Sequence, residues 1–412
     1  MQSDVVIFGG GAAGLWLLDE LTRRGTTCLL LETGELGQGR TAGSQGSIHG
    51  GSNDTLEAPM TGSATGICEL PGVWKACLDG TRQPDLSSTH IRSDCSYVWQ
   101  SESVSSRPGV IDAQVGLHVA AESISPEQRP DVLRDCPGTV TRIDEQVVSP
   151  VSLLANLSAP HTDRILKIDA LGGLDIVCGQ PGQVSAILLT HPKSKETLMI
   201  EPSTVVLTAG AGNAELRSSA GLSAAAIKRS PLHMVMLRGP LPRLNGHCVD
   251  GARTRVTITS DRNSLGQTVW QLGGQLAEDG VPMDESALIA HARHELETVI
   301  PGFDFSRVEW ATYRVDRAQA ENGLHPESVQ VLREGNVVTG SPTKLALVPQ
   351  LVASLVETIT PIAENQAPAT YSAAKQLEPI DWPRPYVALP PWETVSIWHR
   401  ALETATLLQR AA

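Results

Sequence analysis

The sequence lacks several features by which whole classes of protein are recognised. Only 4% of its 412 residues are aromatic, so Leu, Val, Ile and Ala must fill most of its cores. Its 32 basic residues form no Lys/Arg-rich run and are outnumbered by 45 acidic residues, which argues against a nucleic-acid partner. No run approaches the roughly 20 apolar residues of a membrane span, and a strand is expected to start almost at Met1, leaving no room for a signal peptide. We therefore expect a cytoplasmic protein.

The seven cysteines also lack any grouping that would indicate a metal centre or a disulfide framework. They form no Cys-x-x-Cys pair and stand at no metal-like spacing with histidine. Thiols scattered in this way are typical of a reduced cytosolic protein. We expect no metal site.

The first 32 residues have the pattern of a strand, a glycine-rich turn, a helix and a second strand. Residues 4–8 form a continuous apolar run, a helix is expected over residues 12–24, and residues 28–31 form a second apolar run. The intervening turn has the glycine spacing that lets the backbone approach a pyrophosphate at a helix N-terminus. Its candidate cofactor contacts are Gly9, Gly11, Ala12, Ala13 and Gly14. A tight turn without a ligand is the alternative, but the second strand and its acidic end favour a dinucleotide site.

Glu32 ends the second strand eighteen residues beyond Gly14, where an acidic side chain accepts hydrogen bonds from a ribose. Such a residue accepts a free ribose hydroxyl and repels a phosphate. The pattern therefore favours FAD or NAD over NADP, with Thr33 as a neighbouring contact.

Residues 34–51 are unusually dense in glycine and serine. A floppy surface loop is one interpretation. Their position directly after the ribose-binding acid favours another, a segment beside the cofactor whose small residues let backbone amides reach it.

The tetrapeptide at residues 48–51, Ile-His-Gly-Gly, resembles one in glycerol-3-phosphate dehydrogenases. The chain is similar to the FAD-dependent oxidoreductases of the D-amino-acid oxidase and glycerol-3-phosphate dehydrogenase superfamily, with motifs in family order at residues 9, 32, 43–51, 208–212 and 340–345. The resemblance implies that FAD is bound and that this segment lies along the flavin. The contacts it suggests are Gly43, Ser44, Gln45, Ile48 and His49.

The resemblance also implies cofactor contacts from three later segments. The buried run at residues 204–207 is followed by small residues, as after the first strand, and similarity to the family's second cofactor strand suggests Thr208, Ala209, Gly210 and Gly212. A valine near the adenine is expected at Val147 or Val148. The loop before the last helix either starts that helix as a plain turn or directs its amides at the flavin pyrimidine. Its candidates are Gly340, Pro342, Thr343, Lys344 and Leu345.

A chain of this length suggests two domains. We expect an α/β fold with a Rossmann-like FAD-binding domain formed by residues 1–75, 141–225 and 327–412. An α+β substrate domain with a mixed or antiparallel sheet is expected from residues 76–140 and 226–326. Short strands between residues 165 and 200 are expected to form an antiparallel meander attached to the FAD-binding domain.

The function predicted is an FAD-dependent oxidoreductase that takes a hydride from a carbon bearing an amine or hydroxyl group. The substrate expected is a small, anionic amino acid, hydroxy acid or glycerol phosphate, and the electron acceptor stays open between oxygen, a quinone and a protein. An NAD-dependent dehydrogenase explains residues 1–32 equally well but leaves the glycine-rich segment unexplained. A binding protein without redox activity, like the prenyl-protein chaperones that keep this fold, is the third alternative.

Three residues are candidates for catalysis. His49 is interpreted as a base, a hydrogen-bond donor to the flavin, a covalent attachment point, or a residue that merely pins the loop. Arg314 follows the strands of the expected substrate domain, where relatives use an arginine to bind a substrate carboxylate, and Tyr313 is its expected second contact. Because alternate residues of a strand face opposite ways, only one of Arg314 and Arg317 should point to the flavin. A surface ion pair is the alternative for either arginine.

Overall fold

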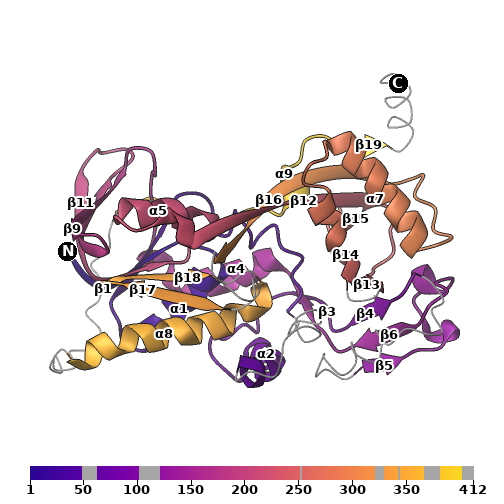
Figure 1. Cartoon of the computed structure of the whole chain (residues 1–412), viewed down its shortest axis with the longest axis horizontal. Coiled ribbons are helices and arrows are strands. Elements are labelled where there is room, and N and C mark those ends of the chain that lie inside the picture. Colours follow the sequence, from indigo (N-terminus) through magenta and orange to yellow (C-terminus); the bar gives the residue numbers. More distant parts are fainter. Residues whose placement is uncertain are drawn as a thin grey trace.

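Two large sheets organise the chain (Figure 1). The computed structural model describes residues 1–48, 63–101, 121–250, 253–320, 329–341, 344–365 and 381–400. The sheets lie toward opposite ends of the long axis of the molecule, and the long strands β12 and β16 run between them. None of the helices in the described part of the chain is long and apolar enough to cross a membrane.

The first sheet is the parallel sheet that the N-terminal pattern predicts. Its order is β17-β18-β11-β1-β2-β8, in which all neighbours are parallel except the edge pair β17 and β18. A meander of β9 and β10 extends it from β11. The strands are β1 (Gln2–Phe8), β2 (Cys28–Glu32), β8 (Ile165–Lys167), β9 (Leu174–Gln180), β10 (Gln183–Thr190), β11 (Thr197–Leu207), β17 (Gln330–Glu334) and β18 (Val337–Ser341).

Burial on both faces explains the unbroken apolar run in β1. Val5 and Ile7 belong to a core shared with the helices on one face, whereas Val6 and Phe8 belong to a second core under the β9–β10 meander. A strand covered on both sides needs apolar residues at every position. The helices of the first core are α1 (Ala12–Arg23), α2 (Ser63–Leu78), α4 (Pro150–Ser158) and α8 (Val348–Asn365).

One expectation for this sheet needs correction. Residues 165–168 were expected in the antiparallel meander, but β8 instead pairs in parallel with β2. Ile165 and Leu166 are both buried, one in each core, as a parallel strand of the main sheet requires.

The second sheet has nine strands in the order β19-β16-β12-β15-β14-β13-β4-β6-β5. All neighbours are antiparallel except β4 and β13, so the sheet is mixed, which confirms the expected fold class. Helices α6 (Gln275–Asp279) and α7 (Glu285–Val299) follow its central strands. The strands are β4 (Ser96–Trp99), β5 (Ala121–Ser123), β6 (Val140–Ile143), β12 (Ile227–Gly239), β13 (Gly246–Asp250), β14 (Arg253–Arg262), β15 (Thr268–Gly273), β16 (Glu309–Ala320) and β19 (His399–Arg400).

A two-stranded sheet and several short helices complete the described fold. The small sheet pairs β3 (Ile91–Ser93) with β7 (Val147–Val148), and an isolated bridge joins Ser47 to Val147. The 3-10 helices are η1 (Pro126–Gln128), η2 (Asp131–Leu133), η3 (Ala159–Arg164), η4 (Gly210–Gly212), η5 (Ala224–Ala226) and η6 (Leu345–Leu347), and the short α-helices are α5 (Asn213–Ser219) and α9 (Pro391–Thr394).

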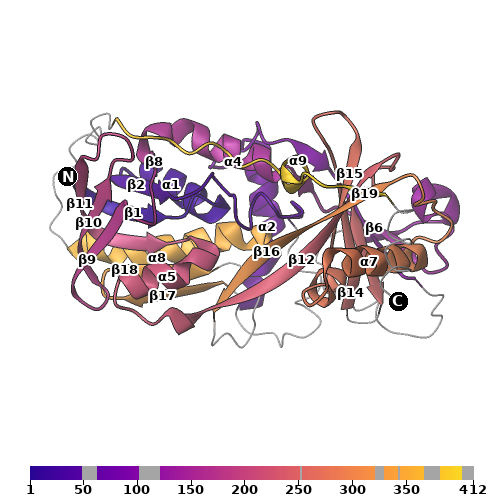
Figure 2. The same cartoon turned by 90° about the horizontal axis from the view of Figure 1, so that it is seen from above.

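Residues 381–400, here called the C-terminal strap, cross from the first sheet to the second (Figure 2). At the start of the strap Trp382 donates its indole N–H to the Lys167 carbonyl at 2.8 Å. Val387 bridges to Leu36, and β19 pairs with β16 at the far end. The strap therefore contacts both sheets, although the sequence assigned residues 327–412 to the FAD-binding domain alone. The domain boundaries themselves stay a prediction.

Candidate active site

The three glycines of the first turn have different surroundings. A Cβ on Gly9 would lie 2.5 Å from the Ala209 Cα, and one on Gly14 would lie 2.0 Å from the Gly9 carbonyl oxygen, so both are kept small by backbone. A Cβ on Gly11 would meet only the Thr41 hydroxyl, at 3.2 Å. Gly11 is therefore the position of this turn where a side chain would project away from protein backbone, which suits a cradle for a phosphate.

Glu32 organises the backbone around that turn. One carboxylate oxygen accepts from the Gly10 N–H at 2.6 Å and the other from the Gly34 N–H at 2.8 Å. The exposed Thr33 hydroxyl lies 3.4 Å from the second oxygen. Each carboxylate oxygen has a second lone pair, so Glu32 keeps the capacity to accept from a ribose hydroxyl while it fixes the turn.

The segment after β11 is tied to the first turn and to β18. The Thr208 hydroxyl donates to the Phe8 carbonyl at 3.0 Å. The fully buried Asn213 accepts from the Ala209 N–H at 2.8 Å and donates to the Gly340 carbonyl at 3.1 Å. One amide side chain thus brings two predicted cofactor segments together. Sequence analysis missed Asn213, although an amide directly after a run of small residues was a usable signal.

The structure describes most of the other candidate cofactor contacts, but not all of them. Val147 and Val148 are buried in β7, and Val148 donates its N–H to the Gly46 carbonyl, so β7 lies against the glycine-rich segment. Ile48 is buried, Gly210 and Gly212 form η4, and Lys344 and Leu345 start the turn before α8. The candidates His49, Pro342 and Thr343 lie outside the described residues.

The two sheets meet where the glycine-rich segment touches β16. The Tyr313 hydroxyl donates to the Gly43 carbonyl at 2.8 Å and accepts from the Gln271 side-chain amide at 3.0 Å. Gln45 crosses the same junction, donating to the Thr257 and Gln271 carbonyls at 3.1 and 3.0 Å. The structure therefore brings Gly43, Gln45 and Tyr313 together. Burial raises the pKa of Tyr313 to about 12, which keeps its hydroxyl protonated near neutral pH.

Arg314 does not reach this junction. It lies on the other face of the sheet from Tyr313, as strand alternation requires, and donates to the Val281 and Met283 carbonyls, both at 3.0 Å. Arg317 is on the Tyr313 side and forms an ion pair with Glu278 at 2.7 Å. The role of Arg314 as a substrate anchor stays a prediction that this geometry does not favour.

Two arginines near Tyr313, the buried Arg92 and the half-buried Arg40, escaped the sequence analysis. Burial lowers the pKa of the Arg40 guanidinium, and its Nη1 has no hydrogen-bond partner among the described residues. Burial also lowers the pKa of Arg92, which Asp261 partly opposes. Both cations act electrostatically on Tyr313. Arg40 lies inside the glycine-rich segment, which was a usable signal, whereas Arg92 stands in a stretch without a recognisable pattern.

FAD fits the residues that are present. The turn at Gly11 leaves room for phosphate, and Glu32 retains acceptor capacity for a ribose. The Ser44 hydroxyl is buried without a hydrogen-bond partner among the described residues, as is Nη1 of Arg40. Buried polar atoms are rarely left unmatched in native proteins, so these two atoms indicate a polar ligand along residues 39–44.

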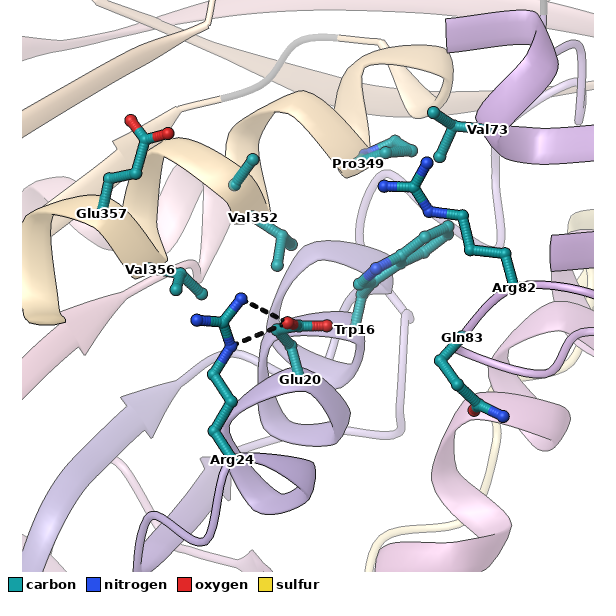
Figure 3. A pocket seen from close by; sticks show the side chains of 11 residues that line it. Trp16, Glu20, Arg24, Val73, Arg82, Gln83, Pro349, Val352, Val356 and Glu357 are labelled. Atoms are coloured by element: carbon teal, nitrogen blue, oxygen red, sulfur yellow. Dashed lines mark hydrogen bonds and ion pairs between the residues drawn. The ribbon is translucent and has the colours of Figure 1, made fainter. Parts of the chain in front are cut away.

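A separate cavity of about 480 Å³ lies between α1, α8 and residues 73–83 (Figure 3). Its walls combine the Trp16 ring and apolar residues of α8 with the Glu20–Arg24 ion pair. It contains none of the residues of the glycine turn or the Gly43–Tyr313 junction. We therefore assign the candidate active site to the junction between the sheets.

Comparisons with known proteins show that the chain is similar to flavoproteins. The family described as "DAO: FAD dependent oxidoreductase" matches residues 4–326. A "Probable FAD-dependent oxidoreductase" of Pseudomonas aeruginosa is 35% identical over 400 residues, which cover 95% of this chain and 98% of the relative. The crystal structure of an FAD-dependent oxidoreductase from that organism has a TM-score of 0.77 at 33% identity and covers 95% of this chain and 98% of its own.

More distant solved structures share the fold. Glycine oxidase from Geobacillus kaustophilus has a TM-score of 0.59 at 20% identity, covering 87% of this chain and 95% of its own. L-alpha-glycerophosphate oxidase from Mycoplasma pneumoniae, solved with FAD bound, has a TM-score of 0.63 at 12% identity and covers 87% and 95%.

Proposed function

The chain belongs to the DAO family of FAD-dependent oxidoreductases, and on that premise we propose that it oxidises a CH–NH or CH–OH group of a small anionic substrate. It is an enzyme with FAD as its cofactor. When bound, FAD supplies the acceptor for the hydride that leaves the substrate carbon. The protein must bind the substrate, orient that carbon and exclude water.

The observation that carries the proposal is the contact between Tyr313 and Gly43. It joins the nine-stranded sheet to the segment expected to lie along the flavin. A substrate bound at this junction meets a polar sheet face on one side and the cofactor segment on the other. The neighbours' names, glycine oxidase and L-alpha-glycerophosphate oxidase, support a substrate that is a small amino acid or glycerol phosphate.

Within this proposal Tyr313 orients groups and does not accept a proton. The Tyr313 hydroxyl donates its proton in a hydrogen bond to the Gly43 carbonyl. Its raised pKa keeps the population of phenolate very small near neutral pH. His49 is our candidate for accepting the proton from the substrate nitrogen or oxygen. The FAD contacts we propose are those predicted at the glycine turn, Glu32 and Thr33, residues 43–49, Val147 or Val148, residues 208–212 and residues 340–345.

Anaerobic bleaching of the flavin tests this function. The purified holoprotein is mixed with amino acids, hydroxy acids, amines and glycerol phosphate, and the visible flavin absorbance is followed. We expect at least one anionic member of the panel to bleach the flavin. If a chemical reductant bleaches the flavin but no member of the panel does, the proposed substrate class is wrong. Where a substrate does bleach the flavin, oxygen or a quinone is added next. The compound that restores the flavin absorbance identifies the electron acceptor.

A further inference from the structure

Among the residues that the structure describes, Arg92 is a buried cation held at one of its three side-chain nitrogen atoms. Its side chain is 3% exposed, and its Nη2 forms an ion pair with Asp261 of β14. Nε and Nη1 have no hydrogen-bond partner among the described residues. Burying donors of a charged group without acceptors is strongly unfavourable. The open donors of Arg92 therefore indicate an anionic partner that the described protein groups do not provide.

The C-terminal strap supplies a second open donor beside Arg92. The ring of Trp392, in α9 of the strap, lies 5.5 Å from the Arg92 guanidinium carbon. Its indole nitrogen is buried and has no hydrogen-bond partner among the described residues. Trp392 also packs in a cluster that includes Ala311 and Tyr313 of β16. The strap thus brings an aromatic wall and an N–H donor to the Tyr313 face of the sheet.

The same sheet face offers an open acceptor. Gln271 is 1% exposed, and its amide N–H group is committed to the Tyr313 hydroxyl, because Tyr313 donates its own proton to Gly43. That fixes the orientation of the amide and leaves Gln271 Oε1 without a partner among the described residues. Thr259, which is paired with Gln271 in the register of the sheet, also has an unmatched buried hydroxyl.

The charges around Tyr313 favour a ligand with one negative charge. Asp261 balances Arg92, and Glu278 balances Arg317. Because Asp261 already forms an ion pair with Arg92, it repels a phosphate dianion at this place more strongly than a carboxylate with its single charge.

We propose that Arg92 and the indole N–H of Trp392 bind a carboxylate group of the substrate, while Gln271 Oε1 accepts a hydrogen bond from its hydroxyl or ammonium group. This inference rests on the proposed function and narrows its substrate class to amino or hydroxy acids. The strap lies beyond residues 4–326 matched by the family, so its part in the site does not follow from family membership.

Binding of a carboxylate that cannot be oxidised tests the pocket without turnover. Acetate is titrated into the holoprotein, and its dissociation constant is taken from the change in flavin absorbance and in melting temperature. We expect Arg92→Gln to raise that constant about 100-fold, since hydrogen bonds to a charged group are lost. Trp392→Phe keeps the ring but loses the N–H, and should raise it about 10-fold. Inorganic phosphate should bind more weakly than acetate to the parent.

A matched control exists on β12, where Arg238 lies against the same strap. Arg238 forms an ion pair with Glu309 at 2.8 Å and lies 4.3 Å from the Trp398 ring, so Arg238→Gln removes an equivalent set of contacts outside the pocket. This variant should bind acetate as the parent does. Equal dissociation constants for Arg92→Gln and the parent would overturn the proposal, as would equal losses in Arg92→Gln and Arg238→Gln.

Two further results separate this proposal from the proposed function. If Arg92→Gln does not fold, Trp392→Phe and Arg92→Lys decide the outcome, and unchanged acetate binding in both refutes the pocket. Acetate binding that depends on Arg92, in a protein whose flavin no substrate bleaches, refutes the function and leaves the pocket standing. Bleaching by an anionic substrate, with acetate binding independent of Arg92, refutes the pocket alone.

Discussion

Replacing Gly11 with valine should produce a folded protein that does not retain FAD. Gly11 is the N-cap of α1, with φ −78° and ψ −179°, an extended conformation that any residue adopts, so valine brings no backbone strain. Its Cβ would lie 3.2 Å from the Thr41 hydroxyl, which accepts from the Ala12 N–H at 3.2 Å. Loss of that single hydrogen bond would cost about 1 kcal/mol of unfolding free energy.

The effect of Gly11→Val on FAD binding should be much larger than its effect on the unfolding free energy. The valine methyl groups would occupy the space where the turn offers its amides to a pyrophosphate, and hydrogen bonds to a charged group contribute about 1.5–3 kcal/mol each. Losing two of them raises the dissociation constant for FAD by at least about a hundredfold. The ratio of flavin to protein absorbance measures retained FAD, and thermal unfolding of the apoproteins measures stability.

Two controls make the result interpretable. Gly72→Ala, in α2, adds a Cβ that meets nothing within 4 Å and should leave flavin content normal. Gly14→Ala places a Cβ 2.0 Å from the Gly9 carbonyl oxygen and should destabilise the apoprotein itself. Full flavin content in Gly11→Val would refute the assignment of this turn to the pyrophosphate.

Three further substitutions test other parts of the site. Glu32→Gln should raise the FAD dissociation constant about tenfold and lower the melting temperature, because an amide can accept only one of the two backbone N–H groups; unchanged values in a flavin fluorescence titration would contradict this. Since the pKa of Tyr313 is raised to about 12 from 10, the parent should lose a few kcal/mol of unfolding free energy between pH 10 and 12. If the unfolding free energy of Tyr313→Phe falls as much as that of the parent over this pH range, the loss does not come from Tyr313. Arg314→Ala should lower stability by about 1–2 kcal/mol through its lost bonds to the Val281 and Met283 carbonyls, and should leave kcat/KM nearly unchanged. A hundredfold fall with normal flavin content would restore Arg314 as the anchor.

Local patterns predicted the cofactor half of the fold well. The buried run of β1, the turn at residues 9–14 and the helix after it are consecutive in the chain, so their spacing alone specifies how they meet. Helix α7 (Glu285–Val299) depends on equally local signals, because Asp284 caps it and apolar residues recur at helical spacing. Both features depend on interactions within a few residues.

The substrate half could not be predicted in the same way. Arg92 meets Asp261 and Trp392 only because three segments, separated by more than a hundred residues, converge on one sheet face. No local spacing encodes such a meeting. Asn213 shares this limit at one of its two contacts, since its partner Ala209 is local but its partner Gly340 lies 127 residues further along the chain.

The register between β12 and β16 finally decides which candidate residue faces the glycine-rich segment. Leu237 pairs with Trp310, and both are buried in the core with α7, while the next pair, Met236 and Ala311, belongs to the opposite face with Trp392. A shift of one residue would place the Trp310 indole among polar groups and expose that core. The apolar residues at the start of β16 therefore fix the facing of Tyr313 as well. In this sheet the hydrophobic pattern selects the tyrosine, and not the neighbouring arginine, as the residue that meets the glycine-rich segment.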